Sequence, residues 1–391
     1  MRTRAGWSAS AAASSSATTS ACTPAAEATN LRLPPDDQLP AFRAALLDWF
    51  DRGRRDLPWR ATKDPYAIWV SEAMLQQTTV ATVQSRWRAF IERFPTVRAL
   101  ADAPLDDVLA QWRGLGYYQR ARNLHAAAQA VAKAGAFPRT ADGWRALPGV
   151  GPYAAAAVAS IAFDDPSAVV DANVKRVLAR LAAREEPVEG TRAAKELAAA
   201  ARRLLDGARP GDWNQAVMEL GATVCSPRAP QCPRCPVAPW CKGLATGAPE
   251  RFPAPSAKPA KDSRTDLAVA VRRGDRVLIL RRPAEARHFG GMWELPRAAV
   301  DPALHHAREA ARVLREVAGL EARSIGDAIL TIRHTVMNSR IELRVCAAEA
   351  DGEPAAPGHD EFRWATAGEW LALPSSSTQH RVAKALAGEG G

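Results

Sequence analysis

The sequence predicts a multidomain protein in which a larger, mainly α-helical domain ends in a cysteine-rich loop and is followed by a smaller α/β domain. The chain has 391 residues, more than one ordinary domain holds. Apolar residues recur at three- and four-residue spacings from about 40 to 224, and after about 264 they change to short β-branched runs. Four cysteines gather in 225–241, between the two regions.

The first 38 residues are rich in Ala, Ser, Thr and Pro and contain no acidic residue before Glu27. Such a segment offers too little bulky apolar surface to fold, so we expect residues 1–38 to form a disordered tail. An Arg-bearing, acid-poor start also fits an organellar transit peptide, although its amphipathic pattern is poor.

The helical domain is expected over 39–224. Stretches such as "AFRAALLDWFDR", "SEAMLQQTTVATVQSRWRAFIERF" and "LDDVLAQWRGLG" carry the helical spacing, and glycines and prolines separate them. The cysteine loop then occupies 225–242. Proline and polar residues make 243–264 a connector between the domains.

The second domain is expected over 265–389. Its first segment, "DLAVAVRRGDRVLILRRP", has two apolar runs around a Gly-Asp turn and predicts a β-hairpin. A helix over 302–318, strands near 327–333 and 339–347, and a helix near 377–388 complete an α/β pattern.

The charge of the chain suits an anionic partner. With 52 Lys and Arg against 42 Asp and Glu, the formal net charge is +10 and the pI about 9.7, as in many proteins that bind nucleic acids. The sequence has no run of about 18 apolar residues, so we expect no membrane-spanning helix.

The four clustered cysteines are Cys225, Cys232, Cys235 and Cys241, spaced C-x6-C-x2-C-x5-C. A disulfide framework is disfavoured because the chain is long enough to bury a core and its other cysteines are sparse. Four thiolates suit tetrahedral zinc or an iron-sulfur cluster. A single C-x-x-C pair flanked by distant cysteines differs from the paired knuckles of zinc sites and favours a cluster.

Two glycine-containing turns are candidates for contact with DNA. "LPGVGPY", 147–153, places Gly149 and Gly151 between helices, where backbone N–H groups can face a phosphate or simply form a helical corner. "GLGYYQRARNL", 114–124, combines two tyrosines with two arginines. Aromatic rings can wedge between bases while arginines neutralise phosphates, or the tyrosines can be buried beside a basic helix face.

Two carboxylates stand at predicted helix starts. Glu72 follows Ser71, a good N-cap, and Asp171 precedes "ANVKRVLARL". Taken alone, both are explained by capping and by interaction with the helix dipole.

Taken together, these motifs resemble the helix-hairpin-helix DNA glycosylases that carry a [4Fe-4S] cluster, and most closely their adenine-specific branch. The match runs from about 40 to 242 and continues more weakly to about 385. Its motifs keep the family order: "LPWR", "SEAMLQQT", "GLGYYQRARNL", "LPGVGPY", "VDANVKRVLAR" and then the cysteines.

The resemblance implies the catalytic residues. Glu72 corresponds to the general acid that protonates the leaving adenine and then helps to activate water. Asp171 corresponds to the carboxylate that stabilises the positive charge on the sugar. Tyr153 stands where the endonuclease III branch has a lysine that forms a Schiff base, so base removal without strand cleavage is expected.

The resemblance also implies the DNA-binding residues and the ligands of the cluster. Residues expected to contact DNA are Arg60, Gln77, Tyr117, Gly149, Gly151, Asn173 and His334. The four clustered cysteines, Cys225, Cys232, Cys235 and Cys241, are expected to hold the [4Fe-4S] cluster, which serves structure and DNA docking rather than the chemistry.

The second domain resembles the Nudix-like module that checks for 8-oxoguanine opposite the adenine. In "RVLREVAGL", Arg312, Glu316 and Gly319 fit the Nudix box, but Val313 and Val317 replace acids, so magnesium-dependent hydrolysis should be lost. The Phe-Ser-His recognition motif of the family appears here as Ile332-Arg333-His334.

The sequence therefore predicts a monofunctional DNA glycosylase that removes adenine opposite 8-oxoguanine or guanine from double-stranded DNA. Two alternatives remain: an endonuclease III-like glycosylase/lyase for oxidised pyrimidines, and a non-enzymatic DNA-binding protein with a cluster. We expect a monomer in the bacterial cytoplasm, associated with the nucleoid, with organellar targeting still open.

Overall fold

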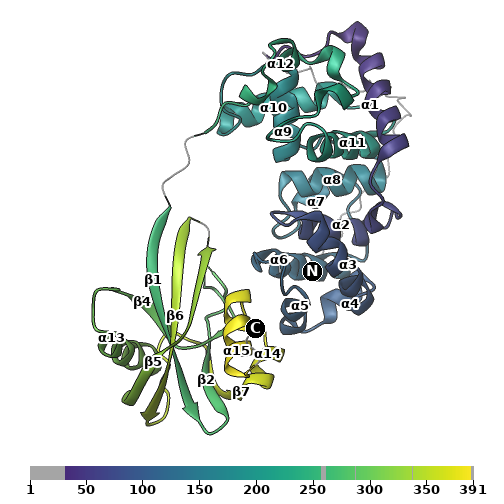
Figure 1. Ribbon diagram of the computed structural model, residues 1–391. Helices are drawn as coiled ribbons and strands as arrows, with labels where there is room; N and C mark the ends of the chain where they lie inside the picture. Colours follow the sequence, from purple (N-terminus) through teal and green to yellow (C-terminus); the bar gives the residue numbers. More distant parts are fainter. Residues whose placement is uncertain (1–30, 257–260, 287, 337, 389–391) are drawn as a thin grey trace, which may run out of the picture.

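The computed structural model describes residues 31–256, 261–286, 288–336 and 338–388. Figure 1 shows the helical domain as a column of helices, coloured purple to teal, and the sheet-containing domain beside one end of it. The predicted order of a helical domain followed by an α/β domain is confirmed. None of the helices in these ranges is both long enough and apolar enough to span a bilayer.

The first domain is built from short helices around one apolar core. They are α1 (Leu39–Gly53), α2 (Pro65–Leu75), α3 (Val80–Arg93), α4 (Val97–Asp102), α5 (Leu105–Gln111), α6 (Gln119–Ala134), α7 (Ala141–Arg145), α8 (Pro152–Phe163), α9 (Ala172–Leu181), α10 (Thr191–Leu204), α11 (Pro210–Thr223) and α12 (Lys242–Ala245).

Helix α8 is the centre of this domain. Its run from Ala154 to Ile161 is buried on every side, as the near absence of polar residues in "AAAAVASIA" requires. Small alanine side chains let α2, α7 and α11 pack closely against it. The helices that carry the functional residues are therefore fixed against a common rigid element.

The boundaries of the first domain are wider than the sequence predicts. Residues 1–30 of the expected disordered tail lie outside the described residues. Leu33, however, is buried in the core, and Arg203 donates to the carbonyl of Pro34 at 2.8 Å. At the other end, α12 and the buried Phe252 pack on the cysteine region, inside the predicted connector 243–264. Local composition could not reveal these contacts, because distant parts of the chain provide the partners.

The second domain is a mixed sheet between two helical layers. Its elements are β1 (Asp262–Arg273), β2 (Arg276–Arg281), β3 (Trp293–Glu294), β4 (Arg297–Val300), α13 (His306–Val313), a π-helical turn (Leu314–Ala318), β5 (Glu321–Val336), β6 (Ser339–Asp351), β7 (Glu361–Thr366), α14 (Ala367–Ala372) and α15 (Ser377–Leu386). The strand order is β3-β2-β1-β6-β5, with β4 on β1 and β7 on β2.

The predicted hairpin is confirmed, because β1 and β2 pair antiparallel across the Gly274-Asp275 turn. Strand β1 also pairs in parallel with β6. One face of the sheet packs on α13 and the other on α14 and α15, which gives two apolar clusters. The short strands β3, β4 and β7 were not predicted, since two to six residues carry too little periodicity.

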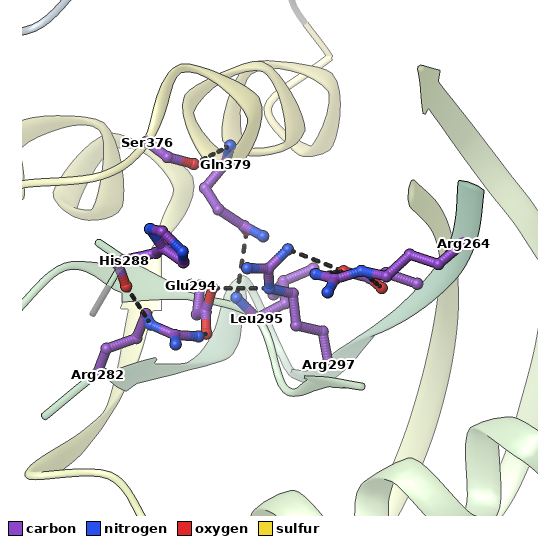
Figure 2. A network of polar contacts seen from close by, with 9 residues as sticks. Arg264, Arg282, His288, Glu294, Leu295, Arg297, Ser376 and Gln379 are labelled. Carbon is purple, nitrogen blue, oxygen red and sulfur yellow. Dashed lines mark hydrogen bonds and ion pairs between the residues drawn. The ribbon is translucent and has the colours of Figure 1, made fainter. Parts of the chain in front are cut away.

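A buried network of alternating charges ties the strands of this domain together (Figure 2). The carboxylate of Glu294 accepts from Arg282 at 2.7 Å and from Arg297 at 2.8 Å. Arg297 also reaches Asp266 at 3.4 Å, and Arg264 lies 3.0 Å from the same carboxylate. Each buried acid thus has two guanidinium partners, which offsets the cost of burying its charge.

The two domains touch at the end of the helical column. The Nη2 atom of Arg281 donates to both carboxylate oxygens of Asp106, at 3.0 and 3.1 Å. The hydroxyl of Tyr118 donates to the carbonyl of Ser375 at 3.2 Å. Arg122 donates to the carbonyl of Gly290. These contacts place Arg281, Gly290 and Ser375 of the second domain against α5 and the N-terminal end of α6.

Candidate active site

A cavity of about 190 Å³ in the helical domain brings together the predicted catalytic residues. Glu72 comes from α2 and Tyr153 from α8, while Asp171 precedes α9. The hydroxyl of Tyr153 donates to Oε2 of Glu72 at 2.7 Å. Arg60 and Asn173 line the same cavity. Glu72 and Tyr153 are 81 positions apart in the sequence and Glu72 and Asp171 are 99 apart, yet all three line one cavity.

The sequence prediction for the helix around Glu72 was wrong. Helix α2 begins at Pro65, and its N-cap is Asp64, which accepts from the N–H of Tyr66 at 3.0 Å. Ser71 donates to the carbonyl of Ile68 instead of capping. The Asp-Pro pair is the stronger start signal, since proline is preorganised for the first helical position. Glu72 therefore lies near the C-terminal end of α2, where the helix dipole cannot explain a carboxylate.

The buried position of Glu72 makes it a proton donor at neutral pH. Burial raises the pKa of this carboxyl to about 7, and the negative charge of Asp171 adds to that rise. The hydrogen bond from Tyr153 and the charge of Arg60 oppose it. A carboxylic acid with a pKa near the working pH can both give and take a proton, as a general acid/base requires.

Asp171 is the N-cap of α9, as the sequence predicts. Its Oδ1 accepts from the N–H of Val174 at 2.7 Å, and its Oδ2 accepts from Asn173 at 2.9 Å. Arg176 in turn donates to Asn173 at 2.9 Å and to the carbonyl of Cys225 at 2.8 Å. A continuous set of hydrogen bonds thus fixes the carboxylate and connects it to the cysteine loop.

The cavity wall contains an acid that the sequence analysis missed. Glu219 on α11 is buried and is bound by Arg55 at 2.6 Å and Arg60 at 2.9 Å. Burial opposes its charge, but these hydrogen bonds prevail and lower the pKa of Glu219 to about 2. An acid inside the apolar stretch "NQAVMELGATVC" was the available signal. Arg60, predicted to contact DNA, therefore stands inside the cavity with a carboxylate partner.

In the turn between α7 and α8, only Gly149 has the positive φ and the close approach of another segment that were predicted for both glycines. Gly149 has a φ of +68°, and the side chain of Asn123 occupies the space that a Cβ would need. Gly151 has a φ of −79° with open space around it, so it is not required for the conformation. It is the N-cap of α8, whose first turn directs N–H groups outward.

The two neighbouring tyrosines have opposite environments. Tyr117 has a φ of +46° and is 49% exposed, whereas Tyr118 is buried against the second domain. Gln77, with a φ of +58°, lines the same groove as Tyr117. The unusual backbone of Tyr117 turns its ring outward, as a wedge between bases requires. For Tyr118, the buried alternative is the correct one.

The arginines that follow are not placed to neutralise phosphates. Arg120 donates to the carbonyls of Ala73 and Met74, each at 2.8 Å, and to that of Leu115 at 2.9 Å. It therefore joins the end of α2 to the turn that carries Tyr117. The guanidinium of Arg122 contacts Gly290 in the second domain. Both residues organise the groove through hydrogen bonds to protein carbonyls.

A groove of about 630 Å³ lies between the domains. The first domain contributes Gln77 and Tyr117, and the second contributes His288, Phe289 and His334. Of the Ile332-Arg333-His334 segment, Ile332 is buried in the core and Arg333 is paired with Glu342 at 2.9 Å. His334 alone faces the groove. Its burial lowers its pKa, so the ring is neutral near pH 7.

The four clustered cysteines are unpaired thiols, and none forms a disulfide. Cys225, Cys235 and Cys241 pack against the helical core, while Cys232 lies at the outer side. Within the described ranges, no three Cys, His, Asp or Glu side chains converge as ligands of a single ion. A set of four thiols in one loop suits either a zinc ion or an iron-sulfur cluster.

The carboxylates remaining in the degenerate Nudix box are occupied. Arg312 binds Glu309 and Glu316, each at 2.7 Å. Val313 is buried in the core of the domain. Val313 and Val317 thus offer no oxygen ligand for magnesium, and the two neighbouring carboxylates are paired with a guanidinium.

Comparisons with known proteins show which families the two domains resemble. Residues 70–205 match the HhH-GPD superfamily base excision DNA repair protein family, and residues 267–385 match the NUDIX domain family. The adenine DNA glycosylase of Homo sapiens is 33% identical over 413 residues, which cover 90% of this chain and 75% of that protein. The adenine DNA glycosylase of Mycolicibacterium smegmatis is 43% identical over 48% of this chain and 64% of its own length. A solved endonuclease III–DNA complex covers 55% of this chain and 99% of its own, with 23% identity and a TM-score of 0.47.

The fold and the site define a base-excision DNA glycosylase with a helix-hairpin-helix catalytic domain and a Nudix-like second domain. Such proteins are enzymes, and their macromolecular partner is DNA. Among them, this chain belongs to the adenine DNA glycosylase family.

Proposed function

We propose that the protein hydrolyses the N-glycosidic bond of adenine opposite 8-oxoguanine or guanine in duplex DNA and leaves the sugar-phosphate strand uncut. The observation that carries this proposal is the pairing of two unlike carboxyl groups in one cavity. Burial raises the pKa of Glu72 to about 7, so this carboxyl is partly protonated at neutral pH, and hydrogen bonds hold Asp171 in position.

The chemistry needs these two groups in different states. Cleavage of the glycosidic bond passes through an oxocarbenium-like transition state, in which negative charge grows on the departing base and positive charge on the sugar. Glu72 donates its proton to the base, and its carboxylate then draws a proton from the attacking water. The carboxylate of Asp171 offsets the charge on the sugar. The adenine reaches the cavity only after it is flipped from the duplex.

The cavity also offers partners for the edge of an adenine. The carboxylate of Glu219 can accept a hydrogen bond from an exocyclic amino group, and Arg60 beside it can donate to a ring nitrogen. Gln77 and Tyr117 at the groove support the flipped state by filling the space that the base leaves. Gly149, Gly151 and Asn173 complete the proposed DNA contacts.

The proposal of a monofunctional enzyme rests on Tyr153. A lyase step needs an amine that forms a Schiff base with the sugar, and a phenol cannot form one. Burial, together with the nearby Glu72, raises the pKa of this tyrosine well above its usual value, so it stays protonated and acts as a hydrogen-bond donor. No lysine is among the described residues that line the cavity.

The proposed cofactor is a [4Fe-4S] cluster on Cys225, Cys232, Cys235 and Cys241. Four unpaired thiols in one loop support it, because a single C-x-x-C pair with one distant cysteine on each side differs from the paired knuckles of zinc sites. When bound, the cluster would cross-link the loop and hold it on the end of α9. The catalytic carboxylates do not depend on it for proton transfer.

The second domain is proposed to read the base opposite the adenine. His334 is the one member of its segment that lines the groove between the domains. The +10 net charge supports binding of the duplex as a whole. We propose that the protein acts as a monomer. Because its substrate is DNA, we propose that it works at the nucleoid of the bacterial cytoplasm.

A single-turnover assay with the full chain in excess tests this function. The duplexes carry adenine opposite 8-oxoguanine, guanine or thymine, and a fourth carries thymine glycol opposite adenine. Strand cleavage is measured with and without alkali. Alkali-dependent cleavage at adenine in the first two duplexes alone is the expected result. Cleavage at thymine glycol without alkali would assign the protein to the endonuclease III-like alternative, and binding without base release would make it a non-enzymatic DNA binder.

The pH dependence of the chemical step should follow the protonation of the Glu72 carboxyl. Because the acid must be protonated and burial raises its pKa to about 7, the single-turnover rate should be flat below about pH 7 and fall about tenfold per unit above it. Tyr153→Phe removes a hydrogen bond that stabilises the carboxylate, so the fall should move to higher pH. If the pH–rate profile of Tyr153→Phe does not shift, the hydrogen bond between Tyr153 and Glu72 does not control the titration of the catalytic acid.

His334→Ala should weaken the preference for 8-oxoguanine. Loss of one hydrogen bond to the partner base is worth about tenfold in rate or affinity, so removal of adenine opposite 8-oxoguanine should slow about tenfold, with little change opposite guanine. His306→Ala is the matched control, because that histidine lies on α13, away from the groove. An unchanged ratio of the two rates in His334→Ala would place the discrimination elsewhere.

A further inference from the structure

Arg180, in the last turn of α9, lies at the centre of the cysteine region. Its side chain is almost completely buried, with only 2% of the residue exposed. The guanidinium donates to the carbonyls of Ser226 at 2.7 Å, Pro227 at 2.9 Å and Phe252 at 2.9 Å. It also donates to Cys225, at 3.2 Å to the carbonyl and 3.3 Å to Sγ.

The main chain of the same residue meets the other end of the loop. The Sγ of Cys241 lies 3.5 Å from the carbonyl oxygen of Arg180. A Cβ on Gly243 would stand 2.6 Å from that oxygen, so α12 can approach only because this position is glycine. Arg180 therefore contacts both the first and the last of the four cysteines, one through its side chain and the other through its backbone.

The charge of Arg180 has no carboxylate partner. The arginines buried to this degree in the described ranges are Arg180 and Arg184. Arg184 is paired with Glu196 and lies 3.8 Å from Glu186. The acceptors of Arg180 are neutral carbonyls and one sulfur, and no acid among the described residues lies within 4.0 Å of it. A buried guanidinium without an anion is costly, since it has lost its hydration.

We infer that Arg180 has two roles toward the proposed cluster: it positions the cysteine loop that binds the cluster, and its positive charge balances the negative charge of the cluster. The hydrogen bonds of its guanidinium group fix the backbone of residues 225–227 before the cluster is inserted. Its positive charge is then balanced by the thiolate-bound cluster, whose net charge is negative. Hydrogen bonds to the sulfurs and charges beside them change the stability and the reduction potential of a cluster. This inference rests on the cofactor under Proposed function and adds the residue that secures it.

The test measures the cofactor rather than the activity. Iron and acid-labile sulfide per chain, visible absorbance, the lifetime of the cluster in a chelator, and its reduction potential are compared in the full-length wild type, Arg180→Lys, Arg180→Met and Arg184→Met. The last variant removes a second buried arginine, whose charge is balanced by acids, so it should melt at a lower temperature yet keep full iron.

Arg180→Met should lose at least half of its iron, and the remaining cluster should decay about tenfold faster with a lower reduction potential. Arg180→Lys keeps the charge but not the fork, so its potential should stay near that of the wild type while the lifetime shortens. A purely structural role predicts that both variants lose iron equally with no change in potential, which would overturn the inference. Full iron and a normal lifetime in Arg180→Met would overturn it as well. Wild-type protein without iron and sulfide would instead refute the cluster itself.

Discussion

Glu72→Gln is expected to slow base release by about 10³-fold in single-turnover assays while binding of the mispaired duplex stays within about threefold. The amide keeps the size of the side chain and its contact with Tyr153 but cannot give a proton to the leaving base. General acid catalysis contributes about 10² to 10⁴-fold, and here the same group also activates water. Fluorescence anisotropy with a labelled duplex measures the retained binding.

The same variant provides its own folding control. Because the native state raises the pKa of Glu72 from 4.5 to about 7, it holds a proton that the unfolded chain releases. The associated stability is fully present below about pH 4.5 and is lost as the pH rises through about 7. Glu72→Gln does not titrate, so it should melt a few degrees above the wild type at about pH 8 and show a smaller difference at about pH 5. A rate unaffected by the substitution would mean that another group is the acid.

Asp171→Asn should lower the rate of base release by about 10² to 10³-fold, the range found when one preorganised electrostatic partner of a transition state is removed. The charge that faces the sugar disappears, but an asparagine oxygen can still accept from the N–H of Val174. Asparagine and aspartate are comparable N-caps, so thermal stability should change little. Single-turnover kinetics and a melting curve separate the two effects.

The matched control for this prediction is Asp64→Asn. Asp64 is also an N-cap, on α2, and it is not among the residues that line the catalytic cavity. This variant should retain nearly full activity. If both variants lose activity to the same degree, the effect of Asp171→Asn comes from the helix cap rather than from charge at the sugar.

Some of the site could be predicted from local pattern and some could not. The apolar spacing and the hairpin turn gave the order and type of the domains, and Asp171 does cap α9. The start of α2 was misplaced because Ser71 and Asp64 are both good caps, and local pattern does not show which one the fold uses. Burial decides the role of Glu72, and burial depends on α8 and α11, which follow much later in the chain.

The remaining differences have the same cause. Glu219 was missed because its two arginine partners, Arg55 and Arg60, lie about 160 positions away. Arg120 and Arg122 carry the expected charge for phosphate contact, yet carbonyl oxygens from other elements take up their donors. A single sequence reports the chemistry of each residue, whereas these outcomes depend on which groups the tertiary fold brings beside it.

The pairing of Arg312 with Glu309 and Glu316 has a consequence for the magnesium requirement of this enzyme. A nucleotide hydrolase of the same fold binds magnesium through carboxylates and the phosphates of its substrate. Here Arg312 pairs with both carboxylates, and the proposed chemistry in the other domain uses only carboxyl groups. Excision of the base would then continue at its full rate when the level of free magnesium changes.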